Sequence, residues 1–278
     1  MENIITKKLD TAELEQKVKK MYSDVALNPN GEFHFEMGRG LAEKLGYEKT
    51  DLDRIPSAAI ESFAGVGYYF DLANLKEGEQ VLDLGSGSGM DVFVAALKVG
   101  NRGHVSGVDM TDEQLEKSER LRKENNLPAG LASPERFAKA SRQGFDNVSF
   151  HKSYIEKLPF ANSSFDVVIS NGVINLSAGK QSVFAEVARV LKPNGRMVIA
   201  DIVTEKQLPE NVVCDSTLWA ACIGGASQED DYRDAIEQAG MEVLYVKTND
   251  AYSFISKSAK GASKEYGVKS VSLIAQRK

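Results

Sequence analysis

An apolar strand, an acid and three closely spaced glycines follow one another in the sequence VLDLGSGSG at residues 81–89. Glycine allows a tight turn and admits a ligand where a Cβ would collide with it. A second apolar stretch ends in an acid within GVDM (107–110), and an acid at that place accepts hydrogen bonds from ribose hydroxyls. The two blocks therefore predict a nucleoside site. Its predicted binding residues are Asp83, Gly85, Ser86, Gly87, Gly89, Asp109 and Met110.

Strand and helix patterns alternate through the middle of the chain, which predicts a doubly wound α/β fold with helices on both faces of a mostly parallel sheet. The expected strands are 80–84, 104–109, 148–151, 165–170, 196–201, 241–247 and 268–275. We expect the last strand to return like a hairpin and to form an antiparallel edge. One helix should run from Met90 to a stop at Gly100, and the next should begin with a capping box in which Gln114 reaches back to Thr111.

Three segments precede or interrupt this alternation. Residues 1–73 carry a helical pattern at 12–26, and we predict that they form an N-terminal helical lid extension. The cofactor-binding domain is then expected over 74–278, with insertions near 128–146 and 205–230. Segments added to this kind of sheet commonly cover the bound ligand.

The composition is that of an ordinary globular protein, with 42% hydrophobic and 27% charged residues. A net charge of −6 disfavours nucleic-acid binding, which needs a basic face. The chain has two cysteines, Cys214 and Cys222, no secretory signal at its start and no apolar run of membrane-spanning length. We therefore expect a cytoplasmic protein with neither membrane nor nucleic-acid partner. The three histidines lie far apart in the sequence, so no metal site is predicted.

The spacing of the glycines distinguishes between two nucleoside ligands. Dinucleotide-binding turns follow G-x-G-x-x-G and place a pyrophosphate on a helix N-terminus, whereas Gly85, Gly87 and Gly89 follow G-x-G-x-G. The carboxylate of Asp83 would repel a pyrophosphate, but it suits S-adenosylmethionine, which carries a sulfonium and an amine. We therefore predict S-adenosylmethionine as the cofactor. A dinucleotide oxidoreductase is the remote alternative.

Two further blocks extend the predicted cofactor site. SYIEKLP (153–159) follows the third strand, where the adenine edge would lie, so Tyr154 and Ile155 would contact the purine. An apolar residue at a strand end is also typical of an ordinary core. SNGVINL (170–176) ends the fourth strand, and there Asn171 and Gly172 would face the ligand across the point where the strand order reverses.

The order of the blocks VLDLGSGSG, GHVSGVDMT, YIEKLP, SNGVINLS and ARVLKPNGRMVIADI resembles that of class I S-adenosylmethionine-dependent methyltransferases. Within that class the chain resembles the arsenite methyltransferases. SNGVINLS and LWAACIGGA (218–226) are similar to the family blocks SNCVINL and LW-x-x-C-x-GG-A, and IPSAAIESFAGVG (55–67) is similar to the segment leading into the domain. The resemblance covers about residues 55–240. It implies a seven-stranded sheet whose last strand runs antiparallel.

The cysteines depart from the family pattern. The resemblance implies that trivalent arsenic is bound by cysteine thiolates, because a soft centre prefers soft sulfur ligands. Cys222 occupies the family position in the CxGG block and is the candidate catalytic residue, through contact with the substrate. A buried small hydrophobe is its alternative role. Gly172 and Val92 stand where the family has cysteines, and residues 1–73 contain none.

Methyl transfer from a sulfonium is an in-line displacement, so alignment of donor and acceptor can supply much of the rate. No histidine or lysine stands in a pattern typical of a general base, which favours an acceptor with a free lone pair, such as trivalent arsenic. The leading hypothesis is therefore a small-molecule methyltransferase of the arsenite methyltransferase type. An O-, N- or C-methyltransferase of an organic metabolite is one alternative, and a cofactor-binding protein without catalysis is another.

Overall fold

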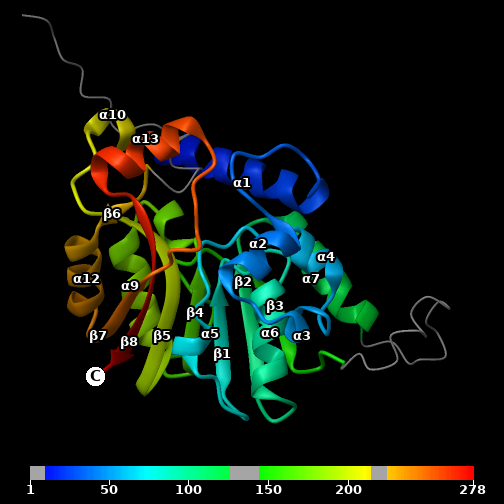
Figure 1. Cartoon of the computed structure of the whole chain (residues 1–278). Helices are drawn as coiled ribbons and strands as arrows, with labels where there is room; N and C mark the ends of the chain where they lie inside the picture. The colour runs from blue at the N-terminus through cyan, green and yellow to red at the C-terminus, as the bar shows by residue number, and fades with distance from the viewer. Residues whose placement is uncertain (1–9, 126–143, 214–223) are drawn as a thin grey trace, which may run out of the picture.

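The computed structural model describes residues 10–125, 144–213 and 224–278, which form one sheet with helices on both faces (Figure 1). The strands are β1 (Gln80–Leu84), β2 (His104–Asp109), β3 (Val148–Lys152), β4 (Phe165–Asn171), β5 (Leu191–Thr204), β6 (Ser227–Gln228), β7 (Met241–Thr248) and β8 (Lys269–Arg277). The helices before β1 are α1 (Thr11–Leu27), α2 (Gly38–Leu45), α3 (Lys49–Leu52), α4 (Ser57–Glu61) and α5 (Phe70–Ala73). The later helices are α6 (Met90–Val99), α7 (Asp112–Asn125), η2 (Ile174–Leu176), α9 (Lys180–Val190), α10 (Glu210–Val213), α12 (Glu229–Gln238) and α13 (Lys257–Tyr266).

The sheet has the strand order β3-β2-β1-β4-β5-β8-β7, and the short β6 pairs with the end of β5. The first five strands in this order run parallel, whereas β8 is antiparallel to both of its neighbours. This arrangement confirms the predicted fold class of a doubly wound, mostly parallel sheet.

The prediction that the last strand forms the edge of the sheet was wrong. β8 lies between β5 and β7, and α13 rather than a tight turn joins β7 to β8. The physical reason is burial: β8 carries a run of buried residues, which suits an inner strand. β7 exposes Leu244 and Tyr245, at 52% and 55%, beside an irregularity in its pairing, and it forms the edge.

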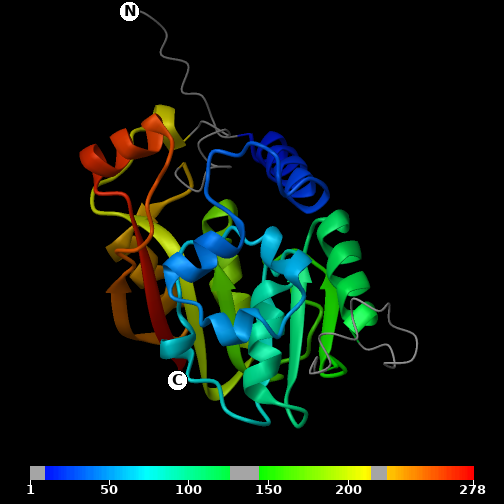
Figure 2. The same ribbon diagram turned by 45° about the vertical axis from the view of Figure 1, so that its right-hand side comes forward.

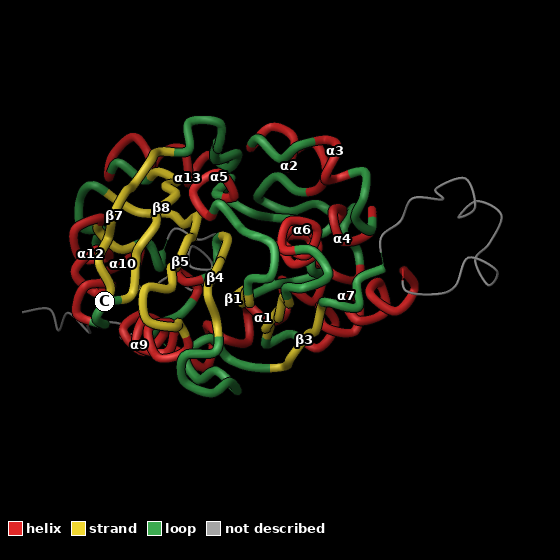
Figure 3. Tube along the Cα trace, turned by 90° about the horizontal axis from the view of Figure 1, so that it is seen from below, coloured by secondary structure: helices red, strands yellow, loops and turns green. Residues whose placement is uncertain are grey.

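Apolar residues are buried on both faces of the sheet, because successive side chains of a strand point to opposite sides. Val81 belongs to a cluster with residues of α6, while its neighbour Leu82 belongs to a second cluster with residues of α9 and α12. Val167 and Val168 divide between the two clusters in the same way. Figure 3 shows α9 on one side of the strands and α5 and α6 on the other.

Helix α1 lies across the end of the sheet at which the parallel strands finish (Figures 1 and 2). Its buried residues Leu14 and Val18 pack against Met110, which follows β2, and against Leu176 of η2. Helix α1 therefore packs against the loops that follow the carboxyl ends of the strands, where a ligand of this fold would lie.

Gln114 of α7 has a different role from the predicted one. Its Oε1 accepts a hydrogen bond from Ser88 Oγ at 2.6 Å, and its Nε2 donates to the carbonyl oxygen of Tyr22 at 2.8 Å. The backbone N–H of Thr111 instead donates to Asp109 Oδ1 at 2.9 Å. The predicted capping box is therefore wrong, because the buried Gln114 side chain joins α1 to the glycine loop.

Residues of the segment that precedes β1, such as Tyr69 and Phe70, share a buried cluster with β1 and α6. The division of the chain into a lid extension (1–73) and a cofactor-binding domain (74–278) stays a prediction. Among the described helices, none combines the length and the apolar character that crossing a bilayer requires.

Candidate functional site

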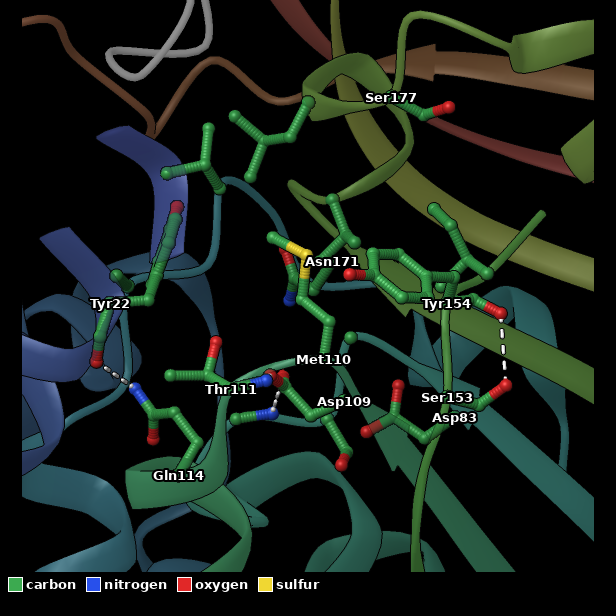
Figure 4. A pocket seen from close by; sticks show the side chains of 18 of the residues that line it. Tyr22, Asp83, Asp109, Met110, Thr111, Gln114, Ser153, Tyr154, Asn171 and Ser177 are labelled. Carbon is green, nitrogen blue, oxygen red and sulfur yellow. Dashed lines mark hydrogen bonds between the residues drawn. The ribbon is translucent and has the colours of Figure 1, made fainter. Parts of the chain in front are cut away.

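A cavity of about 250 Å³ lies at the carboxyl ends of β1, β2 and β4, beneath α1 (Figure 4). β1 stands between β2 and β4 at the point where the strand order reverses, which is where ligands of doubly wound sheets bind. All predicted cofactor-binding residues line this cavity except Gly89 and Gly172. Their part in binding the cofactor stays a prediction.

The glycine loop between β1 and α6 adopts backbone angles that other residues rarely take. Gly85 has a φ of +65° and Gly87 a φ of +53°. A Cβ at Gly85 would lie 2.4 Å from the side chain of Val173, so the loop and the end of β4 approach each other closely only with glycine there. Gly89 packs closely against Phe150 of β3, because a Cβ there would lie 2.8 Å from the Phe150 ring.

Two of the predicted carboxylates lie on the same side of the cavity (Figure 4). Asp109 accepts hydrogen bonds from the backbone N–H groups of Gly87 and Thr111, both at 2.9 Å, and thus holds the glycine loop to the end of β2. Asp83 is 3% exposed and accepts no hydrogen bond from the described part of the chain. Burial raises the pKa of both carboxyls, and the nearby Asp91 and Asp109 raise the pKa of Asp83 further.

Asp91, in the first turn of α6, is a third buried carboxylate in the cavity wall that the sequence analysis missed. Its Oδ1 accepts from the Tyr47 hydroxyl at 2.7 Å, and its Oδ2 accepts from the Tyr69 hydroxyl at 2.7 Å and from Asn171 Nδ2 at 3.2 Å. Burial raises the pKa of Asp91, while these three donors act in the opposite direction. The available sequence signal was an acid two residues after the last glycine of the run.

Asn171 lines the cavity, but its side-chain amide is already engaged. The Oδ1 atom accepts from the backbone N–H of Val66 at 2.7 Å and of Gly67 at 3.3 Å. The Nδ2 atom donates to the Gly67 carbonyl at 3.0 Å and to the Tyr47 hydroxyl at 3.1 Å. Asn171 therefore ties the end of β4 to the segment before α5 and leaves its amide no obvious capacity for a ligand.

Tyr154 connects the loop after β3 with α1. Its hydroxyl donates to Glu15 Oε1 at 2.6 Å and accepts from Lys19 Nζ at 2.6 Å. The Lys19 ammonium also lies 4.8 Å from the centre of the Tyr154 ring. We call Glu15, Lys19 and Tyr154 the α1 latch. The neighbouring Ile155 is buried and lines the same cavity, as a contact to the purine face would require.

The described wall of the cavity is lined by acids and by no lysine, arginine or histidine. The charged residues in that wall are Glu15, Asp83, Asp91, Asp109 and Glu156. In a partly buried cavity such a set attracts a cation and repels a pyrophosphate. Within the described ranges, no three His, Cys, Asp or Glu residues gather as a metal ion would require.

The candidate catalytic residue Cys222 lies outside the described residues, as does Cys214. Gly172, which stands at a family cysteine position, has a φ of +72°, and a Cβ there would lie 3.2 Å from Val66. A cysteine at this position would therefore be strained in the present backbone.

Comparison with known proteins agrees with this geometry. Residues 75–240 match the family described as Methyltransferase domain. The crystal structure of an arsenic(III) S-adenosylmethionine methyltransferase from Chlamydomonas reinhardtii is 32% identical, with a TM-score of 0.64, over 82% of this chain and 72% of that one. The chain belongs to the arsenite methyltransferase family of S-adenosylmethionine-dependent methyltransferases. Both the predicted family and the predicted cofactor are thereby confirmed.

Further relatives show how much of this chain, and how much of each relative, the similarity covers. An arsenite methyltransferase from Halobacterium salinarum is 38% identical over 216 residues, which is 77% of this chain and 50% of that protein. The chain thus spans about half the length of the curated relatives that it matches. A geranyl diphosphate C-methyltransferase from Streptomyces coelicolor shares the fold, with a TM-score of 0.62 at 16% identity over 95% of this chain and 98% of that one.

The residues present fit the family's cofactor. Asp83 offers a buried carboxylate to which the described chain donates no hydrogen bond. The Ser86 hydroxyl is buried and likewise has no partner within the described ranges. A buried carboxylate is usually satisfied, so a cationic ligand accounts for Asp83, whereas the Ser86 hydroxyl is enclosed against Gly107 of β2.

Proposed function

We propose that this chain transfers a methyl group from S-adenosylmethionine to a small-molecule acceptor, and that trivalent arsenic is the first acceptor to test. The observation that carries the proposal is the acidic cavity at the switch point of the sheet, in which Asp83 has no partner among the described residues. When bound, S-adenosylmethionine would supply an electrophilic methyl group on a positively charged sulfur. A neutral or anionic nucleotide would meet the same carboxylates without that compensation.

Different described residues would bind different parts of the cofactor. Asp83 would hold the ammonium of the cofactor, and Asp109 would accept hydrogen bonds from its ribose hydroxyls. Met110 and Ile155 would pack on the adenine, with Tyr154 beside them. Helix α1 covers this part of the cavity through Leu14 and Val18.

Support for a soft acceptor comes from the relatives and from the wall of the cavity. The curated relatives at 36–42% identity are named arsenite methyltransferases. No histidine or lysine lines the described wall, and an acceptor with a free lone pair requires no base.

A specific observation favours a second candidate, methyl transfer to an oxygen, nitrogen or carbon atom of an organic metabolite. The described wall of the cavity contains no cysteine, and Gly172 stands at a family cysteine position with a φ of +72°, where a cysteine would be strained. An organic acceptor needs no thiolate ligands.

The deciding experiment supplies purified protein with methyl-labelled S-adenosylmethionine, arsenite and a thiol, and in parallel with a fractionated metabolite extract. We expect methylated arsenicals, and we expect Cys222→Ser to abolish them if Cys222 binds arsenic, whereas the matched Cys214→Ser variant should retain them. Labelled organic products with no arsenicals would establish the second candidate. Tight cofactor binding with no product in either arm would mean a binding protein without catalysis.

We also propose a cytoplasmic location and no nucleic-acid partner. The net charge of −6 supports the absence of a nucleic-acid partner, because a polyanion is attracted to a basic protein. The two cysteines are compatible with a reducing compartment. Fractionation of cells that express the intact chain tests the location.

A further inference from the structure

Asp91 presents to the cavity a carboxylate that no cation of the described chain balances. It is 5% exposed, and its hydrogen-bond partners are two phenols and one amide, all of them neutral. None of the ion pairs in the described ranges includes it. Its environment therefore supports the charge through donors without neutralising it.

A buried carboxylate in this state is stabilised when a cation lies beside it, and Asp91 lines a cavity that can admit one. Removing a charge from water is costly unless an opposite charge compensates it, and neutral donors compensate only in part. Asp83 stands close enough for the two carboxyls to interact, since Asp91 raises the pKa of Asp83. Two carboxylates in one wall attract a positive charge more strongly than either alone.

The position of Asp91 shows which end of the ligand it would face. The residues assigned to the adenosine are Asp109, which ends β2, and Tyr154, which follows β3. Asp91 instead lies in the first turn of α6 and is hydrogen-bonded to Asn171 at the end of β4. It therefore stands where the glycine loop meets β4, on the side of the cavity away from the adenosine residues.

We propose that Asp91 is a specificity-determining residue that favours the cationic methyl donor over its neutral thioether product, S-adenosylhomocysteine. The inference rests on the proposed function and extends it to product release. Donor and product share the adenosine and the amino-acid head group, so contacts to those parts cannot distinguish them. Discrimination must come from groups that respond to the sulfonium charge or to the methyl group, and a carboxylate responds to the charge.

The test compares three ligands by calorimetric titration of the wild-type protein and Asp91→Asn. The ligands are S-adenosylmethionine, S-adenosylhomocysteine and sinefungin, which carries an amine in place of the methylsulfonium. We expect Asp91→Asn to weaken S-adenosylmethionine and sinefungin by about 10- to 100-fold and to change S-adenosylhomocysteine by less than about threefold. Sinefungin separates the effect of charge from the effect of the methyl group.

A matched control is available in Asp201→Asn. Asp201 is a buried carboxylate that also accepts from a tyrosine, Tyr232, and from an asparagine, Asn175, but it does not line the cavity. This variant should leave the preference among the three ligands unchanged. An equal loss for all three ligands in Asp91→Asn, or no loss, overturns the inference and leaves the proposed function standing. A wild-type protein that binds no S-adenosylmethionine overturns both.

If Asp91→Asn does not fold, Tyr69→Phe provides the second test, because it keeps the carboxylate and removes one donor. Asp83, Tyr47, Tyr68 and Tyr69 are the described titratable groups that interact with Asp91, and burial raises the pKa of all three tyrosines above its ordinary value. Losing a donor raises the pKa of Asp91, so in the variant this carboxylate becomes protonated at a higher pH than in the wild-type protein. When the pH is lowered from about 8 to 5, the variant should therefore lose its preference for S-adenosylmethionine at a higher pH than the wild-type protein does. An unchanged pH profile overturns the inference.

Discussion

Replacing Asp109 by alanine removes a carboxylate that both holds the glycine loop and faces the predicted ribose site. The carboxylate accepts two backbone hydrogen bonds, from Gly87 and Thr111, each at 2.9 Å. Hydrogen bonds to a charged group contribute about 1.5–3 kcal/mol each. The desolvation that raises the pKa of Asp109 offsets part of this gain, so we expect Asp109→Ala to lower the free energy of unfolding by about 1–2 kcal/mol.

The same substitution should weaken S-adenosylmethionine by about 1–3 kcal/mol, because the ribose hydroxyls lose their acceptor. Urea unfolding followed by circular dichroism measures the first effect, and calorimetric titration measures the second. Asp112→Ala is the matched control, since Asp112 is 62% exposed and forms a surface ion pair with Lys152. The control should cost less than about 1 kcal/mol and leave cofactor affinity unchanged. If Asp109→Ala behaves like this control in both assays, the assignment of Asp109 is refuted.

Three further predictions concern Lys180 at the start of α9, the α1 latch and the glycine loop. Burial lowers the pKa of Lys180 from 10.5 to about 8. Between these two pH values the unfolded chain binds more protons than the folded protein, so the free energy of unfolding rises with pH. Lys180→Met should reduce this rise by about 1–2 kcal/mol between about pH 7.5 and 9.5. Tyr154→Phe opens the α1 latch and should speed cofactor release a few fold in stopped-flow experiments, whereas Lys17→Met, in the exposed pair with Glu13 on the same helix, should not. Gly85→Ala should abolish measurable cofactor binding in titrations while circular dichroism shows a folded sheet, because its Cβ would collide with the end of β4.

The parts of the site that follow from local pattern were predictable from the sequence. The strands before and after the glycine run end as predicted, at Leu84 and Asp109, and α6 runs from Met90 to a stop at Gly100. A two-residue alternation, a run of glycines and a helix stop are each encoded within a few neighbouring residues. Their positions also place Asp83 and Asp109 at the carboxyl ends of adjacent strands, so the sequence alone locates the two predicted carboxylates in one cavity.

Only the tertiary structure decided which partners these residues have. The Tyr47 hydroxyl reaches Asp91 across 44 residues, and the Tyr154 hydroxyl reaches Glu15 across 139 residues. It likewise placed β8 inside the sheet and turned Gln114 away from the predicted capping box toward α1. Such contacts leave no periodic pattern, because they arise when segments distant in the chain are packed together. The local sequence therefore determined the strand ends and the glycine loop, and the packing of α1, α6 and β4 against one another determined the charge and the enclosure of the cavity.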